Sequence, residues 1–153
     1  MHKRIFLVFV MYGLVGCNSI YVKPNSLSHN AIVYADRGGY SMRRAIKQEL
    51  ENRGYDVRVG HATESEMSDT DDGDIDMDTY IIPDNARYIV RVRERNPIFR
   101  PIWCSLNGFW WWRFNISIAD NDSGQEVLSW FGNGCAGSSI DLLNRTLDKM
   151  EMH

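Results

Sequence analysis

The sequence predicts a two-layer α/β domain, in which a mixed β-sheet of about five strands carries two helices on one face. Short apolar or alternating segments predict the strands, and two segments with apolar residues at helical spacing predict the helices. Their order along the chain is strand, helix, strand, strand, strand, helix. Because each helix has a single apolar stripe, both can cover the same face of one sheet.

The first three predicted elements lie between residues 31 and 59. The apolar run 31–35 suits a buried strand, and the alternation over 55–59 predicts a second one. Between them, Ser41 can cap a helix that ends at Gly54. The apolar stripe of this helix consists of Met42, Ala45, Ile46 and Leu50. A strand, a helix and a strand within thirty residues predict a right-handed parallel crossover.

Three strands and a helix are predicted in the second half of the chain. The segments 88–93 and 109–118 alternate with period two, and 125–131 follows a polar turn as the next strand of a hairpin. Ser138 or Ser139 can cap the last helix. Its apolar stripe consists of Ile140, Leu143, Leu147 and Met150.

Alternation divides the side chains of these strands between two faces. We expect Trp110, Trp112 and Phe114 to form part of the core. The opposite face then shows a tryptophan and three arginines, which are the residue types that dominate interface hot spots. The sequence therefore predicts a partner-binding surface at Arg91, Arg93, Trp111 and Arg113, for a protein, a glycan or an anionic lipid.

Two alternatives for this surface stay open. The loop 95–108 could cover Trp111 and make it part of the core, or an acidic loop could fold over the arginines. That acidic loop, residues 64–78, holds eight acidic residues and no basic one, so we expect it to be solvated. It fits the EF-hand pattern poorly, because Thr79 stands where a bidentate Glu is required, and an irregular calcium site is the alternative.

The N-terminus carries the most specific motif of the chain. Lys3 and Arg4 precede an apolar run over 5–14 that is too short for a permanent membrane span. A basic start followed by such a run is typical of an export signal, and this one ends in Leu14-Val15-Gly16-Cys17. This ending resembles the lipobox of bacterial lipoproteins. The alternative is a buried N-terminal strand with an incidental cysteine.

The resemblance implies that residues 1–16 are a signal peptide and that Cys17 carries the lipid. Residues 17–30 are then a lipidated tether, and residues 31–153 are a domain outside the cytoplasm. An Asp after the lipidated cysteine would imply retention in the inner membrane, but Asn18 stands there. We therefore expect anchoring in the outer membrane, with the domain facing the periplasm.

With Cys17 assigned to lipid, Cys104 and Cys135 are left as a pair. In an oxidising compartment these two cysteines should form a disulfide. The loop of about 32 residues would be worth roughly 3–4 kcal/mol in the chain-entropy picture. The rival interpretation, a nucleophile or metal ligand at Cys104, lacks a histidine at a suitable spacing.

The net charge and the motifs of the chain argue against several classes of function. The formal charge of −3 would become −5 when Lys3 and Arg4 leave with the signal, which argues against a nucleic-acid partner. No catalytic motif, cofactor motif or metal-ligand spacing is present, so we expect no enzyme activity, no cofactor and no metal.

The order of elements and the hairpin around residues 118–127 look like those of small periplasmic lipoproteins with a TolB-N-terminal-like or LpoB-like domain. We expect a lipid-anchored binding or assembly module. The alternative is an envelope hydrolase that uses a cleft near His61 and Cys104.

Overall fold

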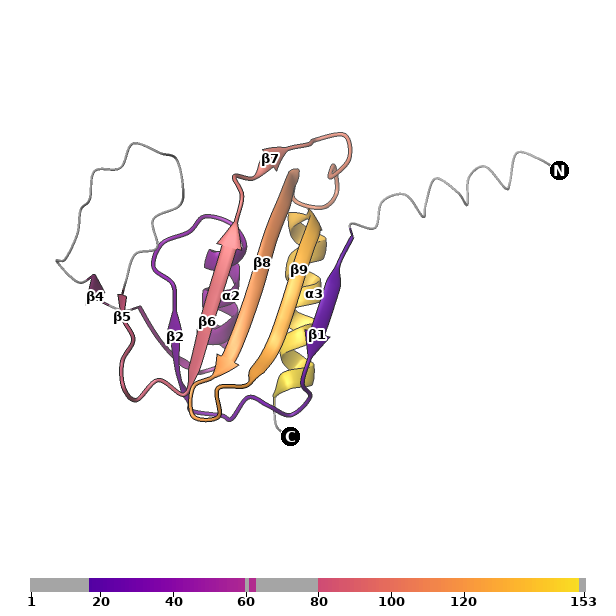
Figure 1. Ribbon diagram of the computed structural model, residues 1–153. Coiled ribbons are helices and arrows are strands. Elements are labelled where there is room, and N and C mark those ends of the chain that lie inside the picture. Colours follow the sequence, from indigo (N-terminus) through magenta and orange to yellow (C-terminus); the bar gives the residue numbers. More distant parts are fainter. Residues whose placement is uncertain (1–16, 60, 63–79, 152–153) are drawn as a thin grey trace.

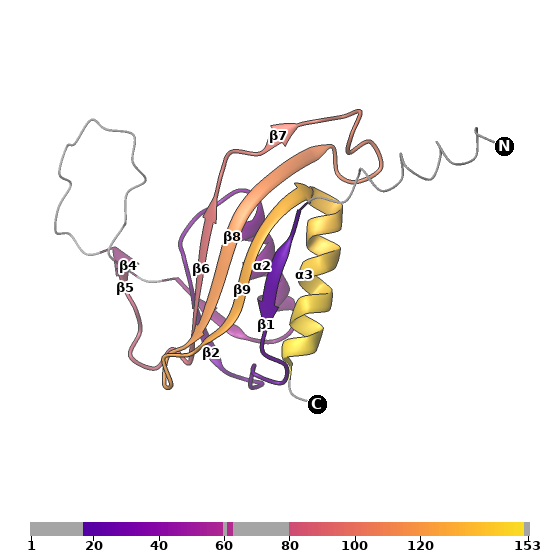
Figure 2. The ribbon, with the colours of Figure 1, turned by 45° about the vertical axis from the view of Figure 1, so that its right-hand side comes forward.

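A computed structural model describes residues 17–59, 61–62 and 80–151 of the 153-residue chain. A seven-stranded sheet packs on two helices, α2 (Met42–Asn52) and α3 (Ala136–Met150), which lie side by side on one of its faces (Figure 1; Figure 2). The α/β class with a mixed sheet is therefore confirmed. The segments 1–16 and 64–78, predicted as signal peptide and acidic loop, lie outside the described residues.

The sheet follows the order β1-β9-β8-β6-β2-β3, and β7 pairs with the start of β8. Its strands are β1 (Ser19–Val22), β2 (Ile32–Ala35), β3 (Asp56–Arg58), β6 (Tyr88–Glu94), β7 (Ile98–Phe99), β8 (Trp110–Asp120) and β9 (Glu126–Cys135). A separate two-stranded sheet consists of β4 (His61–Ala62) and β5 (Tyr80–Ile81).

The sheet is mixed because β2 runs parallel to both of its neighbours. The crossover β2-α2-β3 places β3 beside β2, as the sequence predicts for this part of the chain, and β2 also runs parallel to β6. The remaining pairs, β6–β8, β8–β9, β1–β9 and β7–β8, are antiparallel.

The predicted count of about five strands was wrong, because the main sheet has seven. β1 lies inside the segment 17–30, where we expected only a tether, and it pairs with β9 from Ser19 opposite Phe131 to Val22 opposite Leu128. β7 has two residues. Segments this short give no measurable alternation, so only their pairing partners identify them as strands.

The core lies between the sheet and the helices. Alternate residues of the strands point into it, together with the predicted stripes of α2 and α3. At its centre the rings of Phe114 and Trp130 meet edge to face, with centroids 4.9 Å apart. Gly132 lies against this pair, because a β-carbon there would come within 2.2 Å of the Phe114 ring. The fully buried residues include Leu27, Met42, Ile46, Leu50, Ile116, Ile118, Leu128, Leu143 and Leu147.

The expectation that Trp110, Trp112 and Phe114 share the core holds only in part. Phe114 is buried and Trp112 packs partly against the core, but Trp110 is 44% exposed. Trp110 is the first residue of β8, and its ring contacts Phe99 of β7 rather than a helix (centroids 5.2 Å apart).

α2 begins where the sequence predicts, but its capping contact differs, and α3 begins earlier than predicted. Ser41 is the N-cap residue of α2, but its side chain does not cap the helix; its hydroxyl donates to Glu94, whose carboxylate also accepts the backbone N–H of Arg43. α3 begins at Ala136 directly after β9, so neither Ser138 nor Ser139 is its cap. Ser139 instead donates to the Cys135 carbonyl.

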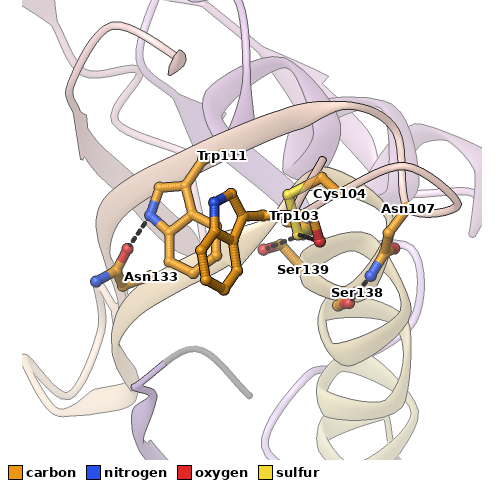
Figure 3. Close-up of a disulfide and its surroundings, with 8 residues drawn as sticks. Trp103, Cys104, Asn107, Trp111, Asn133, Ser138 and Ser139 are labelled. Carbon is orange, nitrogen blue, oxygen red and sulfur yellow. Dashed lines mark hydrogen bonds between the residues drawn. A yellow bond between two sulfur atoms is a disulfide. The ribbon is translucent and has the colours of Figure 1, made fainter. Parts of the chain in front are cut away.

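The predicted disulfide between Cys104 and Cys135 is confirmed, with Cα atoms 5.6 Å apart. It joins the loop after β7 to the junction of β9 and α3 (Figure 3). Among the described residues, no helix is both long and apolar enough to cross a bilayer.

Candidate binding face

In the described part of the chain, the face of the sheet that is turned away from α2 and α3 carries no helix (Figure 2). We call it the open face. Its side chains belong to the alternate set of β1, β6, β8 and β9 that does not enter the core. They include Tyr21, Arg91, Arg93, Trp111, Arg113, Asn115, Ser117, Ser129, Phe131 and Asn133.

The register brings the predicted binding residues onto this face. Arg91 lies opposite Ser117, Arg93 opposite Asn115, and Arg113 opposite Asn133. All three arginines are exposed. The alternation inferred for both strands therefore holds, because a slip of one residue in either would have turned its arginines into the core.

A pocket of about 430 Å³ lies on the open face, lined by residues of β6, β8 and β9 and by Arg95, which follows β6. We call it the arginine pocket. Its lining consists of Arg93, Glu94, Arg95, Arg113, Phe114, Asn115, Phe131 and Asn133. Its volume lies in the range typical of small-ligand sites, about 300–1,000 Å³. Of the four predicted binding residues, Arg93 and Arg113 line this pocket, while Arg91 and Trp111 lie beside it.

The positive charge of the arginine pocket is not neutralised within the described part of the chain. The ion pairs there involve Arg53, Arg58 and Arg87, and none involves Arg93, Arg95 or Arg113. The one acidic residue of the lining, Glu94, accepts hydrogen bonds from Ser41 and from the backbone of Arg43 and Tyr40. The guanidinium groups of Arg93, Arg95 and Arg113 therefore have no ion-pair partner among the described residues.

Trp111 forms part of the surface next to the pocket. It is half-buried, and its indole N–H donates to the Asn133 side-chain oxygen (Figure 3). The guanidinium of Arg100 lies over the ring at 5.7 Å from its centroid. These contacts orient the amide of Asn133 toward Trp111, so Trp111 positions a residue of the pocket lining.

Tyr34 lies on the same side of the sheet, one strand beyond Arg91. Burial raises the pKa of its hydroxyl, the charge of Asp36 raises it further, and Arg91 acts in the opposite direction. Tyr34 is therefore neutral at physiological pH, and as a buried residue of β2 it adds no exposed surface to the open face.

Six lining residues of the pocket were not among the predicted binding residues: Glu94, Arg95, Phe114, Asn115, Phe131 and Asn133. Arg95 follows the same alternation as Arg91 and Arg93, and it lies beyond the predicted end of that strand. Asn133 was missed because the predicted strand ended at Phe131, before the glycines of 132 and 134. β9 in fact continues to Cys135, and the period-two series Ser129, Phe131, Asn133 was the signal that could have extended it.

Within the part of the chain that the structure describes, no catalytic cluster surrounds Cys104. Its sulfur is bonded to Cys135 and the residue is completely buried, so it cannot act as a nucleophile in this state. Among the residues that the structure describes, no group of three or more His, Cys, Asp or Glu side chains could hold a metal ion.

The fold and the open face thus define a two-layer α/β domain with a helix-free, arginine-rich sheet surface. No protein-family model matches the chain, and no curated protein matches it either. Two solved structures of PelC dodecamers from Paraburkholderia phytofirmans are similar in fold. They align with TM-scores of 0.52 and 0.51 at 14% and 15% identity, over 91% of this chain and 99–100% of theirs. At this identity the similarity concerns the fold alone.

Proposed function

We propose that the protein is a lipid-anchored component of the bacterial envelope. Cys17 carries the lipid in the outer membrane, and the domain faces the periplasm as a binding or assembly module. The open face binds an anionic group of an envelope partner, and the arginine pocket is the place where that group is held.

The single observation that supports this proposal best is the composition of the pocket. Arg93 belongs to β6, Arg95 directly follows β6, and Arg113 belongs to the neighbouring β8. None of the three forms an ion pair with a carboxylate among the described residues. Guanidinium groups bind carboxylates and phosphates through paired hydrogen bonds. Asn115 and Asn133 add amide groups, and Phe131 adds an exposed ring that can pack on the apolar part of a ligand.

The pocket lies close to the proposed lipid attachment site. Cys17 lies two residues before β1, and β1 is the edge strand next to β9, which contributes Phe131 and Asn133. A lipid at Cys17 would therefore hold the open face close to the membrane surface.

The experiment that tests anion binding follows the arginine side-chain Nε–H signals by NMR. Glucuronate and inorganic phosphate are titrated as probes, with glucose as the neutral control. We expect saturable shifts for Arg93, Arg95 and Arg113 with both anions and none with glucose. We expect the Arg113→Gln variant to bind at least tenfold more weakly.

The matched control is Arg145→Gln, which removes an exposed arginine of α3 on the opposite face. It should bind the probes as the unmodified protein does. Equal affinity for both variants, or shifts that do not saturate, would mean that the arginine pocket is not an anion site.

A second candidate function is self-assembly. The two similar structures are described as dodecamers, and this chain spans 99–100% of their length. β1 and β3 are the outer strands of the sheet, so both edges are available to a neighbouring copy. Light scattering on the purified protein would show a mass of several chains if this holds, and a single chain if it does not.

A further inference from the structure

We propose that the segment Ile98–Trp110, which we call the apolar loop, inserts into the surface of the lipid bilayer beside Cys17. It would then act as a second membrane contact that fixes the orientation of the domain. Where the bilayer lies relative to the domain depends on the lipid anchor at Cys17, which is part of the proposed function. The insertion of the apolar loop is a claim separate from that anchor.

The apolar loop gathers most of the exposed hydrophobic surface of the described chain. Seven of the ten large hydrophobic side chains that are exposed belong to it. Leu106 is fully exposed and Ile102 is 87% exposed, so neither contacts the core. The seven are Ile98, Phe99, Ile102, Trp103, Leu106, Phe109 and Trp110. The rings of Phe99 and Trp110 contact each other (centroids 5.2 Å apart), and such a concentration of exposed apolar side chains in one segment marks a contact site.

The charge of the loop suits a lipid headgroup region. It contains no Asp or Glu, and its single charge is Arg100. Tryptophan is enriched at membrane interfaces, because one part of the ring is apolar and its N–H is polar. The loop offers Trp103 and Trp110 to such an interface, and Arg100 can contact lipid phosphates.

Backbone hydrogen bonds and the disulfide hold the apolar loop against the domain. The backbone N–H of Arg100 donates to the Phe109 carbonyl (2.8 Å), and that of Cys104 donates to the Arg100 carbonyl (2.9 Å). The disulfide ties Cys104 to the start of α3, and Cys104 itself is completely buried. The loop is therefore held on the domain while its apolar side chains point outward.

The loop lies at the same end of the molecule as the residue expected to carry the lipid. Asn18, the next residue after Cys17, accepts a hydrogen bond from the Trp130 indole (3.0 Å). Along β9, Phe131 lies opposite Ser19 and Cys135 is joined to the loop. Four residues of strand separate these points by about 13 Å. In both views the start of β1 and the loop lie at the upper end (Figure 1; Figure 2).

A lipid bilayer explains these features together. Binding of an interfacial segment strengthens with the apolar area that it buries, and a loop next to an acylated residue adds to that anchor. A second copy of the chain is the competing occupant, but it would account for neither the missing acidic residues nor the closeness to Cys17.

The test places the photocrosslinking residue p-benzoylphenylalanine at position 103 or 106 of the full chain, expressed in bacteria with Cys17 intact. The matched control carries the same residue at Ser123, an exposed position of the turn at the opposite end of β8 and β9. After illumination, mass spectrometry identifies the adducts. Palmitate labelling of the same samples reports acylation at Cys17.

We expect lipid adducts at positions 103 and 106 at least tenfold above those at position 123. Adducts with a second copy of the chain, or lipid adducts no more frequent than at position 123 in palmitate-labelled protein, would overturn the proposal. A failure of the anchor is seen separately, as absence of palmitate.

Discussion

At the scale of single residues, Tyr55 couples the stability of the core to pH. Its hydroxyl is buried and makes no hydrogen bond in the described part of the chain. Burial, together with the nearby charge of Glu151, raises the pKa of this group to about 12. Below pH 10 the hydroxyl is neutral in both the folded and the unfolded chain. Between pH 10 and 12 only the unfolded chain loses the proton, so stability falls as the pH rises.

We therefore expect Tyr55→Phe to increase the free energy of unfolding by about 1 kcal/mol at pH 7, because a buried, unpaired hydroxyl is removed. The loss of stability above pH 10 should also become smaller. Urea unfolding under non-reducing conditions at several pH values measures both effects. Tyr21→Phe, at an exposed position, is the control. A variant that is less stable, or that keeps the same alkaline loss, would show that the hydroxyl has a partner.

Cys17 provides the second test at this scale. Because it follows Leu14-Val15-Gly16, Cys17→Ser should accumulate as an unprocessed precursor without lipid. Incorporation of labelled palmitate, followed on gels, measures the effect. Palmitate on the Cys17→Ser protein would contradict the assignment of this residue as the lipid site.

At the scale of elements, Glu94 of β6 stabilises the start of α2. Its carboxylate accepts the Ser41 hydroxyl (2.6 Å), and it accepts the backbone N–H groups of Arg43 (3.1 Å) and Tyr40 (3.2 Å). These bonds satisfy backbone donors that the helix leaves free, and the negative charge suits the helix N-terminus.

Glu94→Ala should lower the free energy of unfolding by about 1–2 kcal/mol, as loss of a helix cap does. The midpoint of urea unfolding should fall with an unchanged slope. The control is Glu126→Ala, since Glu126 is exposed and its carboxylate accepts a hydrogen bond from the Ser117 hydroxyl (2.6 Å). If both variants lose the same stability, Glu94 does not act as the cap.

The elements also show what the sequence can predict. β6 and β8 are long enough for their alternation to separate core from open face, so Arg91, Arg93 and Arg113 could be placed before the structure was known. β1 and β7 have four and two residues, and their pairing depends on distant partners. The start of α3 was missed because the Cys104–Cys135 bond lies at its first turn, and no capping side chain marks it.

At the scale of the whole molecule, the disulfide joins the apolar loop to the junction of sheet and helix. Replacing both Cys104 and Cys135 by serine should cost roughly 3–4 kcal/mol of stability, because the unfolded chain gains freedom. Urea unfolding of the variant, compared with the oxidised and the reduced protein, measures the loss. An unchanged midpoint would mean that the folded domain does not depend on the bond.

The pairing of these cysteines followed from their number and the expected compartment, and it is confirmed. The pocket itself could not be predicted, because it depends on the order of β6, β8 and β9 across the sheet and on the true end of β9. The binding role of Arg91, Arg93, Trp111 and Arg113 stays a prediction.

The central claim is that the arginine pocket on the open face holds an anionic envelope partner. The most direct measurement places p-benzoylphenylalanine at Phe131, an exposed aromatic position in the pocket lining, and illuminates intact cells that express the full chain. We expect an adduct with one anionic envelope component. It should decrease at least tenfold when Arg113→Glu is added and remain when Arg145→Glu is added instead. An adduct that Arg113→Glu leaves unchanged, or no adduct beyond that of an unilluminated sample, would contradict the account.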